Sequence, residues 1–145
     1  MTVFTKILDG DIPSYKVYED DIAYAFLDIS QITAGHTLVI PKKASISLLE
    51  TADEIAAYIF KIATQLAKKI VQNLGASGCN ILTNAHVVAG QEVMHFHVHI
   101  IPRYDENDGL AIKFISSNPT SEDLSTILEK INRIAGIEKK EFIYK

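Results

Sequence analysis

A periodic run of apolar residues between positions 55 and 74 predicts a long amphipathic helix. Its apolar positions recur at spacings of three and four, as one face of a helix requires: they are Ile55, Ile59, Ile62, Leu66, Ile70 and Leu74. Five polar residues lie between them and should form the face that meets solvent: Lys61, Gln65, Lys68, Lys69 and Gln72. Thr51 and Glu54 have the spacing of a capping box at its start, and Gly75 is placed to end it.

A second helix is predicted near the C-terminus, from about Thr120 to Ala135, with Gly136 as its stop. Its apolar stripe consists of Leu124, Ile127, Leu128, Ile131 and Ile134. We expect a domain core over residues 1–103 and a C-terminal extension over residues 104–145, whose helix packs on the same domain.

Five short apolar or alternating stretches predict strands, at residues 15–18, 23–29, 36–40, 79–84 and 94–101. In the second stretch, Tyr24, Phe26 and Asp28 share one face. The loop from Ala85 to Gly90 is short, so the strands on either side of it should be antiparallel neighbours. Strands and helices do not alternate regularly, and we therefore expect an α+β fold with a mainly antiparallel five-stranded sheet.

The last predicted strand carries His95, His97 and His99 at alternate positions, in a chain with only five histidines. Alternate residues of a strand point to one face, so the three imidazoles should form a row. An imidazole titrates near neutral pH, can act as a nucleophile and can bind metal. The spacing alone leaves three interpretations open: a catalytic site, a His-x-His metal site with a further ligand, or ordinary strand residues.

Several other residues could join this row. His36 opens a strand after a glycine and is a candidate orienting partner. Gly90 would let a ligand approach the backbone closely, and the amide of Gln91 could donate to an anionic oxygen. Asn84 is a similar candidate, although these residues would equally suit turns. The chain has neither a Gly-x-x-x-x-Gly-Lys-Ser/Thr loop nor a Gly-x-Gly-x-x-Gly motif, so a bound nucleotide is not held by those devices.

The composition excludes several classes of protein. The chain has 145 residues, of which 48% are apolar and 22% charged, as expected of one domain with a real core. The formal net charge of −4 gives no positive surface for nucleic acid, and no apolar run approaches the roughly 20 residues of a membrane span. We therefore expect neither a nucleic-acid nor a membrane partner. The single cysteine, Cys79, and the lack of an apolar signal segment favour a cytoplasmic protein with Cys79 buried as a small hydrophobe.

The chain resembles the histidine triad (HIT) family, whose defining pattern is His-φ-His-φ-His-φ-φ with φ an apolar residue. Residues His95–Ile101 match every position of this pattern. Four further blocks match in the family's order, at Val3–Ile7, Phe26–Ile29, His36–Lys43 and Gly90–Val93. The resemblance covers about residues 3–103 and is nearest to the Hint-like branch of bacterial type.

The resemblance implies a HIT-like fold and a nucleotidyl hydrolase or transferase. The reaction would cleave at the α-phosphate of a purine nucleoside phosphoramidate or dinucleoside polyphosphate, an AMP or GMP derivative. His97 would attack phosphorus and form a covalent nucleotidyl-histidine, His99 would assist the leaving group, and His36 and His95 would position the cluster. The implied nucleotide-binding residues are Phe4, Phe26, Asp28, Ile29, Asn84, Gly90, Gln91 and Val93.

Three departures from the family pattern affect these expectations. Thr2 and Thr5 stand where many relatives have a zinc-binding Cys-x-x-Cys, and Ala44 stands where some have a histidine. We therefore expect no metal and no cofactor. Glu92 stands where phosphoramidate-cleaving relatives often have serine, and a carboxylate repels a phosphate, so the leaving group stays open. Two other functions also stay open: a metal-dependent enzyme using His-x-His, and a non-catalytic nucleotide-binding scaffold.

The resemblance further implies a homodimer that pairs through the long helix and an adjacent strand. Ala56, Tyr58 and Phe60 add apolar surface outside the helix's main stripe, which fits a second partner. Beyond the histidines, Arg103 and Tyr104 could reach the leaving-group side of the site, or Arg103 could form a surface ion pair.

Overall fold

The computed structural model describes residues 1–133, 136–137 and 139. It divides the chain into two compact units, residues 1–111 and 112–145, and each is described by itself. Within the described part of the chain, no helix has both the length and the apolar composition needed to cross a membrane.

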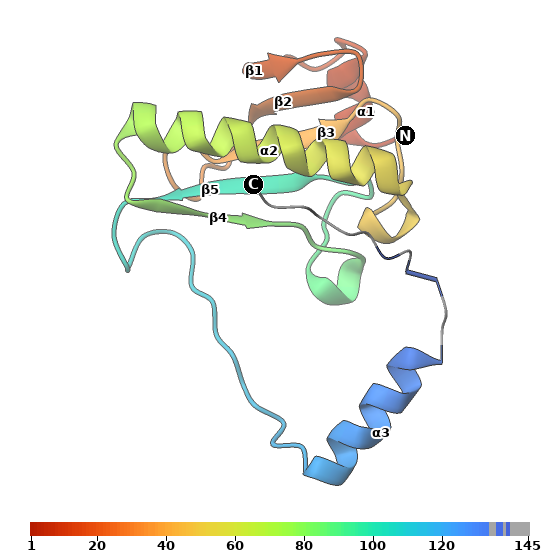
Figure 1. The fold of residues 1–145 in the computed structure, drawn as a ribbon. Helices are drawn as coiled ribbons and strands as arrows, with labels where there is room; N and C mark the ends of the chain where they lie inside the picture. The colour runs from red at the N-terminus through yellow and green to blue at the C-terminus, as the bar shows by residue number, and fades with distance from the viewer. Residues whose placement is uncertain (134–135, 138, 140–145) are drawn as a thin grey trace, which may run out of the picture. The chain divides into compact units, whose positions relative to one another are not determined.

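The first unit is built on a five-stranded sheet (Figure 1). Its strands are β1 (Lys16–Glu19), β2 (Ala23–Leu27), β3 (Thr37–Pro41), β4 (Gly78–Leu82) and β5 (Val98–Arg103). They lie in the order β1-β2-β3-β5-β4, and every neighbouring pair is antiparallel. The predicted α+β fold with a mainly antiparallel sheet is confirmed, as is the antiparallel pairing of the strands that flank the loop from Ala85 to Gly90.

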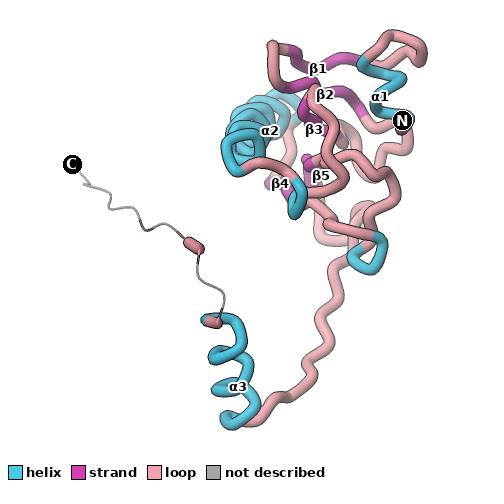
Figure 2. The backbone as a smooth tube through the Cα atoms, turned by 90° about the vertical axis from the view of Figure 1, so that its right-hand side faces the viewer, coloured by secondary structure: helices cyan, strands magenta, loops and turns pink. Residues whose placement is uncertain are grey.

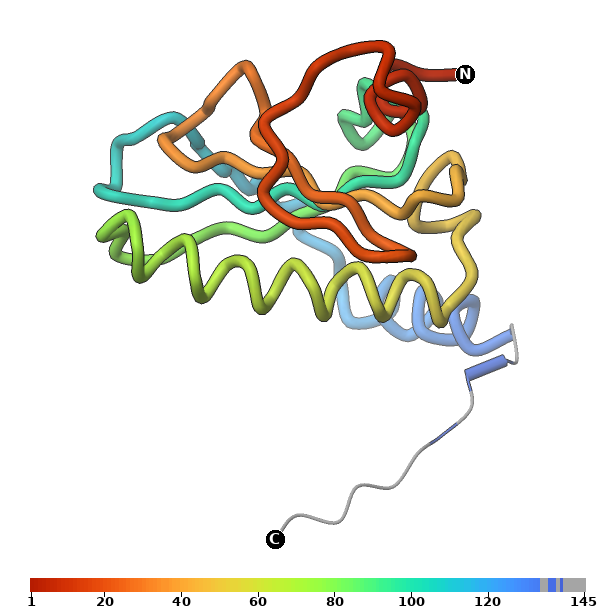
Figure 3. The backbone as a smooth tube through the Cα atoms, turned by 90° about the horizontal axis from the view of Figure 1, so that it is seen from above, coloured from red at the N-terminus to blue at the C-terminus, as the bar shows by residue number. Residues whose placement is uncertain are grey.

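Helix α2 (Asp53–Leu74) runs along one face of the sheet (Figures 1 and 3). The predicted stripe buries Ile59, Ile62, Leu66 and Ile70 against Val39, Val98 and Ile100 of the sheet. Gly75 follows the helix as expected. The predicted capping box is wrong, because the N-cap residue is Ala52 and the Thr51 hydroxyl donates instead to the carbonyl of Ser47.

The opposite face of the sheet packs against a short helix that the sequence pattern did not indicate. This helix, α1 (Val3–Leu8), inserts Phe4 among Tyr24, Phe26, Leu38 and Ile40. Figure 2 shows α1 and α2 on opposite sides of the strands. The predicted common face of Tyr24 and Phe26 is confirmed, since Ala25 lies in the core beneath α2 instead.

The three histidines do not form one regular strand. Strand β5 begins at Val98, so that His99 lies in it while His95 and His97 precede it. The backbone leaves the sheet here because its hydrogen bonds go elsewhere: the Phe96 amide donates to the Ser45 carbonyl. The Thr83 hydroxyl donates to the His97 carbonyl. The prediction of a single strand over 94–101 is therefore wrong at its N-terminal half.

Two further expectations need correction. His36 lies immediately before β3 and does not open it. Cys79 is exposed and not buried, because it lies on β4, which is an edge strand of the sheet.

Two short 3-10 helices complete the first unit, η1 (Leu48–Glu50) and η2 (Val87–Ala89). In the second unit, α3 (Ser121–Asn132) starts with a capping box between Thr120 and Asp123. It ends before Gly136, while Ile134 and Ala135 lie outside the described residues. No residue of α3 is buried, and both the division after residue 103 and the packing of this helix on the core stay predictions.

Candidate active site

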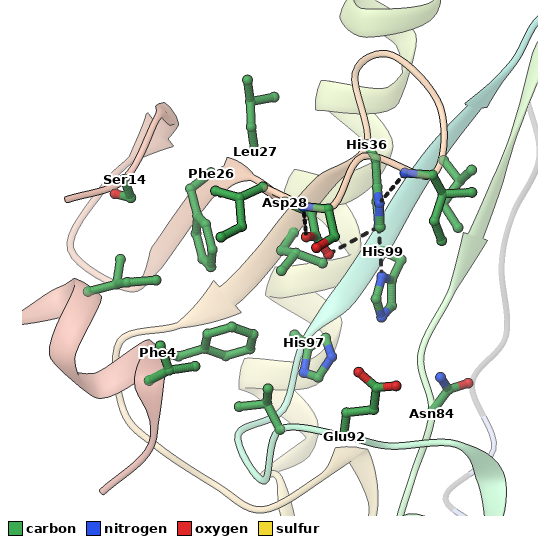
Figure 4. A pocket seen from close by; sticks show the side chains of 18 of the residues that line it. Phe4, Ser14, Phe26, Leu27, Asp28, His36, Asn84, Glu92, His97 and His99 are labelled. Carbon is green, nitrogen blue, oxygen red and sulfur yellow. Dashed lines mark hydrogen bonds and ion pairs between the residues drawn. The ribbon is translucent and has the colours of Figure 1, made fainter. Parts of the chain in front are cut away.

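A pocket of about 650 Å³ opens on the α1 side of the sheet, with the histidines on its wall (Figure 4). One end is apolar and includes Phe4, Ile7 and Phe26. The other end is polar and includes Asn84 and Glu92, with His97 and His99 between the two ends. Segments far apart in the sequence thus build a single elongated site.

The apolar end is an aromatic corner. The rings of Phe4 and Phe26 meet edge to face, with centroids 5.5 Å apart, and Phe4 also meets the ring of His97 at 5.1 Å. Ile29 is 86% exposed and contributes to the pocket rim. Such a corner offers flat apolar surface to an aromatic ligand directly beside an imidazole.

One ring nitrogen of His97 has a defined role. Nδ1 lies 2.7 Å from the carbonyl oxygen of His95, which can only accept, so Nδ1 carries the proton. In the neutral ring Nε2 then holds a lone pair. Burial lowers the pKa of His97 below its ordinary value, which keeps the ring neutral near pH 7. His97 is therefore prepared to act as a base or nucleophile.

His36 and His99 form a directed pair. The backbone N–H of Ile32 points to Nδ1 of His36 at 3.3 Å, so Nδ1 accepts and Nε2 carries the proton. Nε2 of His36 lies 2.9 Å from Nδ1 of His99 and donates to it. His99 then carries its own proton on Nε2, which makes His99 a hydrogen-bond donor in the pocket.

Electrostatics keep this pair neutral. Burial, together with repulsion from His97 and His36, lowers the pKa of His99 to about 4. Burial also lowers the pKa of His36, although the nearby Asp28 carboxylate opposes the shift. The pocket therefore presents one imidazole lone pair, on His97, beside one imidazole N–H, on His99, with ring centroids 4.9 Å apart.

Asp28 lies where β2 ends, at the edge of the histidine cluster. One carboxylate oxygen accepts from the Ser30 amide at 2.8 Å, and the other lies 3.8 Å from Nε2 of His36. The side chain is partly exposed and lines the pocket, so it can also accept hydrogen bonds from a ligand.

His95 does not reach the pocket. It is fully buried, and its Nε2 donates to the Pro41 carbonyl at 2.9 Å. Its Nδ1 has no hydrogen-bond partner. Its contribution runs through its carbonyl oxygen, which holds the Nδ1 proton of His97.

The loop between β4 and β5 supplies the polar end of the pocket. Gly90, Val93 and Asn84 all line it, as predicted for them, together with Glu92. Gly90 has φ of 96°, a left-handed conformation that favours glycine.

The predicted role of Gln91 is wrong, because its side chain points away from the pocket. It is 3% exposed, and its amide donates to the carbonyls of Ile46 and Val93 at 2.6 and 2.9 Å. Its side-chain carbonyl oxygen, Oε1, accepts from the backbone N–H of His86 at 2.7 Å. Gln91 therefore fixes the loop and does not contact the ligand space.

Two further residues, His86 and Glu50, help to hold the loop between β4 and β5, and the sequence did not indicate them. Nε2 of His86 lies 2.9 Å from a carboxylate oxygen of Glu50 in η1. His86 also adopts a positive φ of 74°, which is uncommon for residues other than glycine. No local pattern indicated this pairing, because the two residues are 36 positions apart.

The predicted position of Arg103 at the leaving-group side is not observed. Arg103 pairs with Asp108 and donates to Asn80 at 2.8 Å, and it does not line the pocket. The Tyr104 hydroxyl donates to the carbonyl of Ala34 at 2.6 Å. The surface ion pair, the other expectation for Arg103, is confirmed.

Among the described residues, the one group of three or more side chains arranged closely enough for a metal is Asp28, His36 and His99. Its ligand atoms lie within 4.8 Å of one another. This is not the His-x-His pair of the metal hypothesis, because His99 is the one histidine of the row in this group. Any metal here would have to replace the proton between His36 and His99.

A histidine-lined pocket on one face of an antiparallel α+β domain is typical of a known class of protein. The family model described as the HIT domain matches residues 9–106. The chain belongs to the histidine triad (HIT) family, as its sequence pattern predicted.

Relatives agree over most of the chain. A Bacillus subtilis relative named Protein hit is 46% identical over 131 residues, covering 89% of this chain and 90% of its own length. The Schizosaccharomyces pombe relative named adenosine 5'-monophosphoramidase is 38% identical over 130 residues, covering 90% and 95%. A crystal structure of a HIT family protein from Bacillus subtilis matches with a TM-score of 0.87 and 42% identity, covering 94% of this chain and 99% of that one.

Proposed function

We propose that this protein is a nucleotidyl hydrolase or transferase that cleaves at the α-phosphate of a purine nucleotide derivative through a covalent nucleotidyl-His97 intermediate. The observation that carries the proposal is the paired state of two imidazoles: a lone pair on His97 Nε2 beside an N–H on His99 Nε2. Membership of the HIT family and the phosphoramidase name of the yeast relative support hydrolysis of a nucleotide.

The pocket suits an AMP or GMP derivative in one orientation. The purine would lie in the aromatic corner against Phe4 and Phe26, with Ile29 at the rim. The ribose hydroxyls would donate to the free oxygen of Asp28. The α-phosphate would then lie beside His97 and His99, with Asn84 and the backbone around Gly90 and Val93 next to its oxygens.

The reaction proceeds in two displacements. Nε2 of His97 attacks phosphorus with its lone pair and forms a P–N bond, while the bond from phosphorus to the leaving nitrogen or oxygen breaks. The leaving atom takes up one proton, which enters from solvent. Water then attacks phosphorus, the bond to His97 breaks, and the proton that water loses returns to solvent.

In this scheme His99 and His95 stabilise the charges that develop during the reaction. The Nε2–H of His99 donates to the phosphate or to the leaving atom, where negative charge develops. The nucleotidyl-imidazole of His97 carries a positive charge, and its Nδ1–H stays bonded to the His95 carbonyl. His36 holds His99 in the tautomer that donates.

The test measures turnover of adenosine phosphoramidate and diadenosine polyphosphate side by side on metal-stripped protein. Rapid acid-free quenching should capture nucleotidyl-protein with wild type and not with His97→Ala. We expect His97→Ala to lose roughly 10⁴-fold or more in kcat while remaining folded. A folded His97→Ala protein with near-normal rates would exclude the covalent mechanism.

The same experiment separates the two alternative functions. A metal-dependent enzyme built on Asp28, His36 and His99 would lose turnover on chelation and regain it with added metal. A non-catalytic nucleotide-binding scaffold would bind AMP without turning over either substrate.

We further propose that the protein is a homodimer. Strand β4 lies at an edge of the sheet, and its unpaired backbone is a ready surface for a second copy. Ile81 of β4 and part of the α2 surface are exposed beside this edge. Tyr58 and Phe60 pack partly on the core of their own unit, so they leave less apolar surface for a second copy. The exposed edge of β4 therefore supports the homodimer more strongly than these two residues do.

A further inference from the structure

The polar end of the pocket carries negative charge that the proposed reaction does not use. Glu92 lines the pocket with an exposed side chain. In Figure 4 it extends beside His97 and next to Asn84, on the side of His97 away from Phe4. With the base at Phe4 and the phosphate at the histidines, Glu92 therefore lies where the leaving group must be.

No lysine or arginine lies beside this carboxylate in the lining of the pocket, as far as the structure describes the chain. Of the pocket-lining residues, all of which fall within the described residues 3–110, none is lysine or arginine. Arg103 is held by Asp108 and Asn80 away from the pocket. The histidines are held neutral by burial, so they supply hydrogen bonds without a full positive charge.

This charge pattern discriminates between leaving groups. The leaving group of a dinucleoside polyphosphate carries several negative charges, and each would be repelled by the Glu92 carboxylate. An amine leaving group that also bears a remote ammonium group would be attracted by the same carboxylate. A leaving group without a remote charge would be neither repelled nor attracted by Glu92.

We propose that Glu92 makes this pocket select nucleoside phosphoramidates whose amine carries a second, positively charged group. The proposal rests on the nucleotidyl-transfer function above and names the leaving-group class for the same site. Glu92 acts as a specificity-determining residue, because its carboxylate meets the remote end of the leaving group and not the phosphorus.

The test uses three AMP phosphoramidates that differ only in remote charge. Their amines are 1,5-diaminopentane, pentylamine and 5-aminopentanoate, whose remote groups are positive, neutral and negative. The charged group is separated from the leaving nitrogen by an alkyl chain, so the strength of the P–N bond changes little. We expect kcat/KM of wild type to fall by about tenfold at each step from positive to neutral to negative.

Two variants and one control identify the residue. Glu92→Gln should shrink these ratios to about twofold or less, and Glu92→Lys should reverse their order. The wild-type ratios should also shrink as salt is raised. Glu54→Gln removes the same charge from an exposed position of α2 outside the pocket, and it should leave all the ratios as in wild type.

The outcomes separate this proposal from the proposed function. If wild type turns over neither the three compounds nor adenosine phosphoramidate nor diadenosine polyphosphate, the nucleotidyl-transfer function fails. If it turns over only adenosine phosphoramidate or diadenosine polyphosphate, the leaving-group selection alone fails. If it turns over all three with equal kcat/KM, or Glu92→Gln retains the wild-type ratios, only the leaving-group selection fails. A Glu92→Gln protein that loses the same factor in kcat for all three would place Glu92 in the chemical step and would also overturn the selection.

Discussion

His36 and His99 lie side by side although 63 positions separate them in the chain: Nε2 of His36 is 2.9 Å from Nδ1 of His99, and their rings stack with centroids 5.2 Å apart. The contact forms because β3 and β5 are neighbours in the sheet. Gly35 has φ of 96°, and a side chain there would meet Leu74 at 2.6 Å, so the turn before His36 requires glycine. The pair sets the tautomer of the imidazole that faces the ligand.

The first prediction concerns this pair. His36→Leu removes the donor to His99, so His99 can adopt the other tautomer and present a lone pair to the phosphate. We expect kcat for adenosine phosphoramidate to fall on the order of a hundredfold, with a smaller change in KM.

His36→Gln is the matched control, because its side-chain amide can place a donor close to the position of Nε2. It should recover part of the loss. Equal rates for His36→Leu and wild type, measured by steady-state kinetics on folded proteins, would show that the tautomer of His99 does not matter.

The second prediction is a pH dependence. The nucleophile must be unprotonated, and burial lowers the pKa values of His97 and His99, the latter to about 4. The acid limb of kcat/KM should therefore lie below the ordinary histidine value near 6.5, with full activity at pH 7. A limb centred at 6.5 or above would contradict the neutral cluster.

The same shifts predict how stability changes with pH. The unfolded chain binds protons at histidine near pH 6.5, whereas folded His99 does so only near 4. Between these values the unfolded state holds more protons, so the free energy of unfolding should fall as pH is lowered from about 6.5 to about 4. Urea unfolding at several pH values measures this slope, and His99→Phe should reduce it.

The third prediction concerns the anchored loop. Gln91→Leu leaves the His86 amide and two backbone carbonyls without their partners, and we expect a loss of about 2 kcal/mol in the free energy of unfolding. KM should rise because Gly90 and Val93 are no longer held at the pocket.

Gln91→Glu retains the acceptor for His86 while losing the two donated bonds, and it tests which end of the amide matters. Urea unfolding and KM are measured for both variants. If Gln91→Leu is as stable as wild type with an unchanged KM, the loop has another anchor.

The fourth prediction is the homodimer. Light scattering at micromolar concentration should give twice the monomer mass. Ile81→Lys adds a charge to the exposed side of the edge strand and should shift the protein toward monomer. A wild-type protein that is monomeric throughout would overturn the proposal, and a fully dimeric Ile81→Lys protein would place the interface elsewhere.

The fifth prediction concerns the C-terminal extension. Asp108 binds Arg103 and Leu110 lines the pocket, so the cut that tests the extension belongs after Ala111, where the first unit ends. We expect the protein truncated there to stay folded and to keep nucleotidyl transfer, with a changed ratio of rates for phosphoramidate and dinucleoside polyphosphate. An unchanged ratio would show that residues 112–145 do not choose the leaving group.

Elements with local signals could be predicted from the amino-acid sequence without the structure. The period of the α2 stripe and the face shared by Tyr24 and Phe26 follow from helix and strand geometry, so they could be predicted from spacing alone. The family blocks likewise indicated which residues would surround the ligand, and most of them do line one pocket.

Features that depend on contacts between distant segments became visible only in the folded protein. The strand over 94–101 was predicted too long because Ser45 and Thr83 take the backbone bonds of Phe96 and His97. The spacing placed His95 in one row with His97 and His99, yet its ring binds the Pro41 carbonyl in the interior. Gln91 was expected to contact the ligand, yet its amide binds the Ile46 carbonyl. Hydrogen-bond partners far along the chain cannot be found from local spacing, because only folding brings them within bonding distance.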